Sequence, residues 1–179
     1  MFRKFYPYEY IDSVFAIDYE KLFRQGFRGV IFDIDMTLVP HGADSTPKID
    51  ALFKNIHAIG LKTLLLTNND GERVKSFVKN IDTPYICDAN KPNPAAYLKA
   101  IETLNIKREE AIFVGDQIFT DILGANKCGL ASILVKYVTA REETNIGIRR
   151  RLEKIILKFY SWNNSCRHRL GYILKEEDT

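Results

Sequence analysis

The sequence contains few cysteines and histidines, and their positions argue against two kinds of site. Cys87, Cys128 and Cys166 lie far apart and form no CxxC pair, and the three histidines form no cluster with the spacing of metal ligands. We therefore expect neither a disulfide framework nor a structural zinc site. A reducing, cytoplasmic compartment is the expected location.

Long apolar runs are also missing. No segment approaches the length of a membrane-spanning helix, and the first residues, MFRKFYPYEYIDSVF, lack the continuous apolar core and the cleavage site of a secretory signal. The net charge of +3 is too small to indicate a partner by itself. With 46% hydrophobic and 27% charged residues, the 179-residue chain has the composition of one soluble globular domain.

Apolar strand patterns and amphipathic helix patterns alternate through the middle of the chain. Strands are predicted over 29–34, 61–68, 83–88, 110–116 and 131–138, and helices between them over 47–59, 71–80, 93–105 and 118–129. This alternation is typical of a parallel sheet with helices on both faces. We therefore expect an α/β fold built on a five-stranded parallel sheet.

Polar residues follow the first four predicted strands, at the point where each strand ends. In an open parallel sheet, ligands bind beyond the carboxyl ends of the strands, so these residues predict one common site. In chain order they are Asp33, Asp35 and Thr37, then Thr67, Asn68 and Asn69, then Asp88, Asn90 and Lys91, and finally Gly115, Asp116 and Asp121.

This set of side chains suits phosphoryl transfer from a phosphomonoester. Asp33 can attack phosphorus and form an aspartyl-phosphate, and Asp35 can protonate the leaving oxygen and then activate water. Thr67 offers a hydroxyl and Lys91 a positive charge to the phosphate. Asp33 and Asp116 offer the hard oxygen ligands that Mg²⁺ prefers.

Each fragment alone also has an ordinary interpretation. A DxD pair occurs in metal-dependent glycosyltransferases and in acidic loops, a TNN stretch is a common loop, and Asp116 could simply cap a helix. The four fragments occur in order, each at a strand end, and together they favour the catalytic interpretation.

The stretches FDIDMTL, LLLTN, Lys91-Pro92 and FVGDQIFTD resemble the four motifs of the haloacid-dehalogenase-type hydrolase superfamily, over roughly residues 29–138. The resemblance implies a Rossmann-like three-layer α/β/α sandwich and Mg²⁺ as cofactor. Asp35, two residues after the nucleophile, argues for a phosphatase over a dehalogenase. The implied roles are catalysis by Asp33, Asp35 and Lys91, substrate binding by Thr67, Asn68 and Lys91, and metal binding by Asp33, Asp35 and Asp116, with Asp121 a further ligand or a support for the ligands.

The spacing of the motifs leaves no room for the inserted cap domain of most members. In this respect, and in its FDID, TNN and DANKP stretches, the chain is similar to the capless subfamily IIIA, called YqeG-like, and to mitochondrial phosphatidylglycerophosphate phosphatases. We therefore expect an open site for a bulky phosphomonoester, with phosphatidylglycerophosphate as the leading candidate. Met36 departs from the pattern, because Asn or Gly usually stands there and suits a tight backbone.

We expect one domain over 1–179, with a lead-in over 1–28, a catalytic core over 29–138 and a helical tail over 139–179. The tail predicts a basic amphipathic helix that covers the sheet edge with its apolar face and leaves a solvated basic side. The alternative is peripheral binding to an anionic membrane, on its inner face. The apolar face consists of Ile148, Leu152, Ile155, Ile156 and Phe159, and the basic residues Arg149, Arg150, Arg151, Lys154 and Lys158 lie mostly off it.

A non-enzymatic function is the alternative to the phosphatase. Such a protein would keep the magnesium site and act by RNA, ribosome or membrane association through the basic tail. Nucleic acid is the less favoured partner, because the chain contains no recognised nucleic-acid-binding module. The sequence indicates no oligomeric state.

Overall fold

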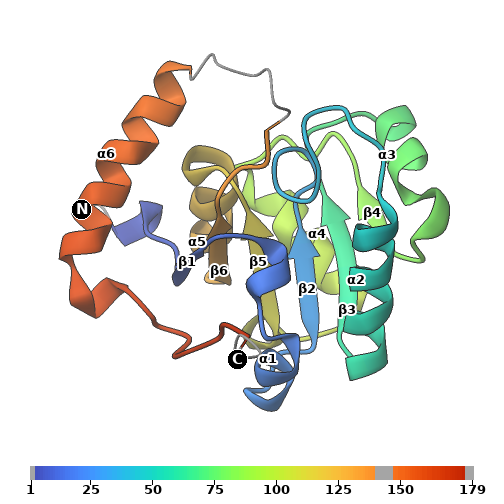
Figure 1. Ribbon diagram of the computed structural model, residues 1–179, viewed down its shortest axis with the longest axis horizontal. Helices are drawn as coiled ribbons and strands as arrows, with labels where there is room; N and C mark the ends of the chain where they lie inside the picture. The colour runs from blue at the N-terminus through green and yellow to red at the C-terminus, as the bar shows by residue number, and fades with distance from the viewer. Residues whose placement is uncertain (1–2, 140–146, 176–179) are drawn as a thin grey trace.

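The protein is described from a computed structural model that covers residues 3–139 and 147–175. One sheet of six parallel strands runs through the molecule, in the order β1-β6-β5-β2-β3-β4 (Figure 1). The strands are β1 (Glu9–Ile11), β2 (Gly29–Phe32), β3 (Lys62–Leu66), β4 (Tyr85–Ile86), β5 (Ala111–Gly115) and β6 (Ala131–Val135).

Helices cover both faces of this sheet and make three layers (Figure 1). Because side chains alternate along a strand, Val30 and Phe32 in β2 pack on one side with Leu22, Ile49 and Val74, from α1, α2 and α3. On the other side Ile31 packs with Tyr97 of α4 and Ala125 of α5. The helices are α1 (Tyr19–Arg24), α2 (Pro47–Ile59), α3 (Gly71–Phe77), α4 (Pro94–Leu104), α5 (Leu123–Lys127) and α6 (Ile148–Trp162).

The predicted Rossmann-like α/β/α sandwich is confirmed, with one more strand than the five expected. The additional strand, β1, pairs with β6 at the edge of the sheet, where Glu9 lies opposite Ile133. It is only three residues long and stands between Pro7 and Asp12, so its alternation is too short to predict a strand.

The C-terminal segment of the described chain runs beside β1 and the residues that follow it. The buried carboxylate of Glu9 accepts a hydrogen bond from the Leu170 backbone N–H (3.1 Å) and lies 3.0 Å from Nδ1 of His168. Further along, the Asp18 N–H donates to the carbonyl oxygen of Ile173 at 2.8 Å. The C-terminal segment therefore fastens the N-terminal edge of the sheet.

Helix α6 packs against this same side of the molecule, but not through the face that the sequence predicts. Ile156 and Leu157 contact a cluster that includes Ile118, Ile122 and Leu134, and Tyr160 packs on Tyr6. The expectation that the whole apolar face covers the sheet edge is wrong, because four of its five residues remain exposed: Ile148, Leu152, Ile155 and Phe159. Among the described residues, no helix is long and apolar enough to cross a membrane.

Candidate active site

Two aspartates meet because β2 and β5 are neighbours in the sheet. Phe32 lies opposite Val114, and the Asp33 N–H continues the pairing by donating to the Val114 carbonyl oxygen at 3.0 Å. Asp33 and Asp116, the first aspartates beyond the two strands, therefore project from the same edge of the sheet. Both are buried, with only 6% and 3% of their surface exposed.

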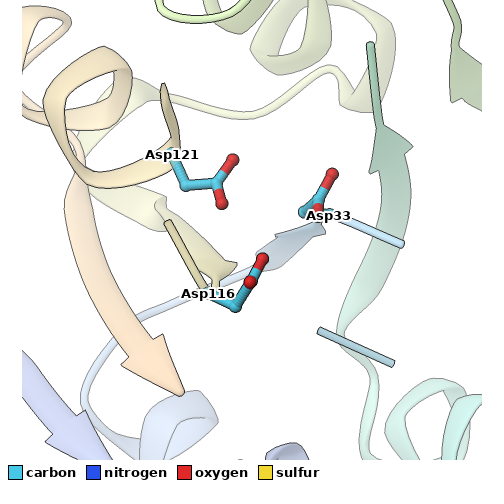
Figure 2. A group of neighbouring side chains, drawn as sticks. All are labelled: Asp33, Asp116 and Asp121. Carbon is cyan, nitrogen blue, oxygen red and sulfur yellow. The ribbon is translucent and has the colours of Figure 1, made fainter. Parts of the chain in front are cut away.

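A third carboxylate joins them from the π-helical turn Ile118–Ile122, which follows β5. Asp121 is fully buried, and Figure 2 shows its carboxylate pointing toward those of Asp33 and Asp116. One carboxylate oxygen from each residue lies within 4.8 Å of the other two. The Gln117 N–H donates to Asp121 Oδ2 at 3.0 Å and fixes its orientation.

Gly115 makes room for this third carboxylate. A Cβ at position 115 would lie 2.6 Å from the Cβ and Cγ of Asp121, well inside van der Waals contact. A glycine at the end of β5 is thus required by the close approach of a side chain, rather than by an unusual backbone angle.

Lys91 supplies a positive charge at the centre of the site. Its Nζ lies 2.5 Å from Asp33 Oδ1 and 2.7 Å from Asp121 Oδ1, and the side chain is buried. The Lys91 backbone N–H donates to Asn68 Oδ1 at 2.7 Å. Asn68 thereby holds the loop that carries Lys91, and it remains exposed at the mouth of the site.

Two threonines complete the edge of the site. Oγ1 of Thr37 lies 3.1 Å from Asp116 Oδ1 and 3.3 Å from Asp33 Oδ2, so this hydroxyl bridges the two carboxylates. Thr67 is buried at the end of β3, where its Oγ1 accepts a hydrogen bond from the Asn69 N–H at 3.2 Å. Met36 adopts a left-handed φ of 66°, which explains why a small or turn-tolerant residue would suit this position.

The electrostatics of the three carboxylates fit a bound cation. Burial, together with the charges of Asp121 and Asp116, raises the pKa of Asp33 to about 7 despite the opposing effect of Lys91. Burial and Asp121 likewise raise the pKa of Asp116 to about 6. This cluster carries more negative charge than its neighbours offset, and three hard oxygen donors are a suitable ligand set for Mg²⁺.

Asp35 lies outside this cluster of three. It accepts hydrogen bonds from Arg73 Nη2 (2.8 Å) and Asn69 Nδ2 (3.0 Å), and His41 Nδ1 lies 3.1 Å away. Burial alone would raise the pKa of Asp35, but the hydrogen bonds from Arg73 and Asn69 and the charge of Arg73 outweigh burial and lower it. Asp35 is therefore a carboxylate at neutral pH, and its role as a metal ligand stays a prediction.

The structure brings two arginines to the site that the sequence did not single out for it. Besides Arg73, Arg150 of α6 contacts the Asp116 carboxylate, and its Nη1 donates to the Asp116 carbonyl oxygen at 2.7 Å. Arg150 also pairs with the buried Glu153, whose Oε1 accepts from the Ile118 N–H at 2.8 Å. The expected open site is thus partly covered by the tail.

A cavity of about 380 Å³ lies between the tail and the catalytic loops. Arg149 and Leu152 of α6 line one part of it, and Lys91, Pro92, Phe119 and Thr120 line the rest. Asp33, Asp116 and Asp121 do not line this cavity, which reaches the site only at Lys91.

Comparison with known proteins also indicates a hydrolase. A family model described as HAD-hydrolase-like matches residues 88–152. The chain is 34% identical over 179 residues to the "Probable phosphatase YqeG" of Bacillus subtilis (strain 168), covering 99% of this chain and 100% of that protein. This chain belongs to the haloacid-dehalogenase-like hydrolases, and it is a phosphatase of that family.

The name of a second relative includes a substrate. The chain is 30% identical over 164 residues to "Phosphatidylglycerophosphate phosphatase 1, chloroplastic/mitochondrial" of Arabidopsis thaliana. The match covers 85% of this chain but only 47% of the plant protein, so the chain spans about half of that relative.

Solved structures agree on the fold. A haloacid dehalogenase-like family protein from Streptococcus pneumoniae superposes with a TM-score of 0.53 at 14% identity, covering 77% of this chain and 99% of that one. An uncharacterized protein from Listeria monocytogenes serotype 4b gives the same TM-score at 18% identity, covering 75% and 99%. At these identities the likeness concerns the fold alone.

Proposed function

We propose that this phosphatase is a magnesium-dependent phosphomonoester hydrolase that works through an aspartyl-phosphate on Asp33. The observation that carries the proposal is the surroundings of Asp33. Its carboxylate lies between the amine of Lys91, 2.5 Å from Oδ1, and the hydroxyl of Thr37, 3.3 Å from Oδ2, beside the carboxylates of Asp116 and Asp121. A nucleophile, a cation-binding group and a buried positive charge thus meet at one point.

In the first step, a carboxylate oxygen of Asp33 bonds to phosphorus while the bond from phosphorus to the leaving oxygen breaks, and Asp35 gives a proton to that oxygen. In the second step, water attacks phosphorus and loses a proton to Asp35, and inorganic phosphate leaves with Asp33 restored. Mg²⁺, when held by Asp33 and Asp116 with Asp121 as a further ligand or support, supplies positive charge that offsets the phosphate.

Lys91, Thr67 and Asn68 form the substrate-binding group in this proposal, with Asn68 contributing through the position of Lys91. Lys91 attracts the phosphate oxygens, Thr67 donates its hydroxyl from the end of β3, and Asn68 holds the Lys91 loop by its 2.7 Å hydrogen bond. The lowered pKa of Asp35 suits the second step, in which it accepts a proton. A phosphate dianion near Asp35 would raise that pKa and favour the proton donation of the first step.

The proposed substrate is a bulky phosphomonoester, with phosphatidylglycerophosphate the leading candidate. Similarity to the plant relative supports this choice, as does the cavity that continues from Lys91 to the apolar side chain of Leu152. We place the protein in the cytoplasm, with peripheral association at the inner face of a membrane. The non-enzymatic alternative is not favoured, because the relative that matches 99% of this chain is a probable phosphatase, and Met36, the departure from the motif pattern, replaces no catalytic group.

Turnover of an aryl phosphate by the full chain, with and without Mg²⁺, tests the chemistry. Asp33→Asn should fold normally and lose activity, because an amide does not attack phosphorus, and beryllium fluoride should form its adduct on Asp33. An adduct on another residue, or turnover by Asp33→Asn close to that of the wild type, would refute the assignment. A panel of phosphorylated lipids, sugars, nucleotides and peptides then ranks substrates.

A further inference from the structure

Helix α6 carries a stripe of apolar side chains that the fold leaves uncovered. They recur every three or four residues, and in an α-helix this spacing places them on one face. Between 47% and 78% of each residue is exposed, although each is large and apolar. We call these residues the α6 stripe: Ile148, Leu152, Ile155, Phe159 and Trp162.

The opposite face of the helix already provides its attachment to the protein. Leu157 and Tyr160 pack on the core clusters, and Glu153 bonds the Ile118 N–H and Arg150. The helix is therefore anchored mainly by this face, and the α6 stripe stays exposed, although Leu152 also lines the cavity beside the catalytic loops. Contiguous exposed apolar surface of this kind marks an interaction site more often than an accident of sequence.

Basic side chains border the stripe. Arg151, Lys154 and Lys158 are exposed along one margin, and Arg149 lies on the other. Lys158 Nζ lies 5.3 Å from the centre of the Trp162 ring. Glu153 is the only acidic residue in α6, and it is buried and paired. The exposed surface of the helix is thus apolar in the middle and positive at the edges, with no negative charge of its own.

The stripe starts beside the loop that carries Lys91. Leu152 lines the cavity that also contains Lys91, and Arg149 lies beside it. In Figure 1, α6 begins at the end of the molecule toward which the arrowheads of β2 and β3 point. Any surface that binds the α6 stripe would therefore lie close to the Lys91 loop of the active site.

We infer that the α6 stripe docks the protein on an anionic lipid bilayer, with the apolar side chains in the interface and the basic margins on lipid phosphates. The pattern is that of a helix lying in the membrane plane. The link to a lipid substrate rests on the proposed function, whereas the docking itself does not. A second copy fits poorly, because like-charged margins would face each other. Nucleic acid fits poorly as well, because it leaves the apolar centre exposed to water.

The chain contains a single tryptophan, Trp162, so its fluorescence reports directly on the stripe. When the full chain is mixed with vesicles of phosphatidylglycerol and phosphatidylcholine, the emission should shift to shorter wavelength. Lipids brominated in their acyl chains should quench it. Binding should weaken between about 0.1 M and 1 M salt, as the Debye length falls from about 10 Å to about 3 Å, and should be weak on pure phosphatidylcholine.

Matched variants separate docking from folding. Ile155→Asp, at an exposed position, should abolish quenching while leaving the melting temperature and aryl phosphate turnover unchanged. Leu157→Asp, two residues away on the packed face, should instead lower the melting temperature. Replacing Arg151, Lys154 and Lys158 with Gln should weaken vesicle binding by about fivefold for each charge removed.

Three results would overturn the inference. One is a wild-type spectrum that anionic vesicles leave unchanged at low salt. The second is a spectral shift that grows with protein concentration without lipid, which indicates self-association. The third is a shift larger with single-stranded RNA than with vesicles. Aryl phosphate turnover is measured in parallel, so loss of docking with turnover intact refutes the docking alone, and docking without turnover refutes the phosphatase mechanism alone.

Discussion

The guanidinium of Arg150 contacts the carboxylate of Asp116, which is a proposed metal ligand. The arginine comes from the C-terminal helix, whereas Asp116 follows the central strand β5. Burial would lower the pKa of Arg150, but the charges of Asp116 and Glu153 outweigh burial and raise it. Arg150 therefore places a permanent positive charge beside the position where a divalent cation would bind.

Arg150→Gln should tighten Mg²⁺ binding by about tenfold, because a like charge next to the cation is removed. Calorimetric titration of the full chain with Mg²⁺ measures this directly, without reference to turnover. Arg151→Gln is the matched control, since Arg151 is exposed on the same helix. Weaker Mg²⁺ binding in Arg150→Gln would mean that the arginine instead holds Asp116 in a ligating position.

Asp33→Asn should stabilise the metal-free protein, and more so at high pH. The folded state raises the pKa of Asp33 from 3.8 to about 7, so it binds this proton more tightly than the unfolded chain does. By linkage, the free energy of unfolding of the wild type falls as pH rises from about 3.8 to about 7. Asparagine does not titrate, so the variant does not lose this stability.

In EDTA, the melting temperature of Asp33→Asn should exceed that of the wild type by several degrees above about pH 8, given about 2–4 °C per kcal/mol for a chain of this size. The difference should shrink as pH falls toward about 4, where the unfolded chain begins to bind the proton as well. Asp12→Asn serves as an exposed control. A pH-independent difference would argue that burial does not disfavour the Asp33 carboxylate.

Arg73→Gln should raise the pKa of Asp35, because it removes both a charge and a hydrogen bond that stabilise the carboxylate. If Asp35 accepts the proton in the water step, the acidic limb of the kcat profile should move to higher pH. Lys75→Gln, exposed in the same helix α3, should leave the limb in place.

Asp35→Asn tests directly whether Asp35 transfers a proton during turnover. It should slow turnover by about 10²–10⁴-fold, with a smaller loss for aryl than for alkyl phosphates, since aryl leaving groups need less protonation. Equal losses on the two substrates would contradict a proton-transfer role for Asp35.

Gly115→Ala should displace Asp121, because the new Cβ would lie 2.6 Å from its side chain. Overpacking of this kind typically costs about 1–3 kcal/mol of unfolding free energy, and the altered carboxylate should also weaken Mg²⁺ binding. Gly147→Ala is a suitable control, because a Cβ there meets nothing within 4 Å. Thermal melting and calorimetric Mg²⁺ titration of both variants test this prediction. A Gly115→Ala protein with the melting temperature and Mg²⁺ affinity of the wild type would contradict it.

The sequence predicts the central sheet well because each strand is short, apolar and followed by polar residues. It predicts helix α2 almost to the residue, since Thr46 caps it through a 3.3 Å bond from the Ile49 N–H and Gly60 ends it with a φ of 99°. The proximity of Asp33, Lys91 and Asp116 follows from strand order, which a parallel alternating pattern strongly restricts.

What the sequence does not predict depends on contacts between distant residues. Periodicity alone does not distinguish which of three consecutive arginines turns inward, and Arg150 does so because Asp116 and Glu153 receive it. The face of α6 that packs is likewise chosen by partners such as Tyr6 and Leu134, far away in the chain. From the sequence alone, Glu153 would be expected to be exposed to solvent. It is buried because it bonds the Ile118 N–H and Arg150.

The attachment of the C-terminal segment to β1 has a consequence for the order in which parts of the sheet can form during translation. Glu9 and its strand are synthesised well before their partners, which are β6 and the segment around His168 and Leu170. The central strands can pair while translation continues, whereas β1 must wait as an unpaired segment. The outer edge of the sheet therefore closes only after β6 and this segment have left the ribosome.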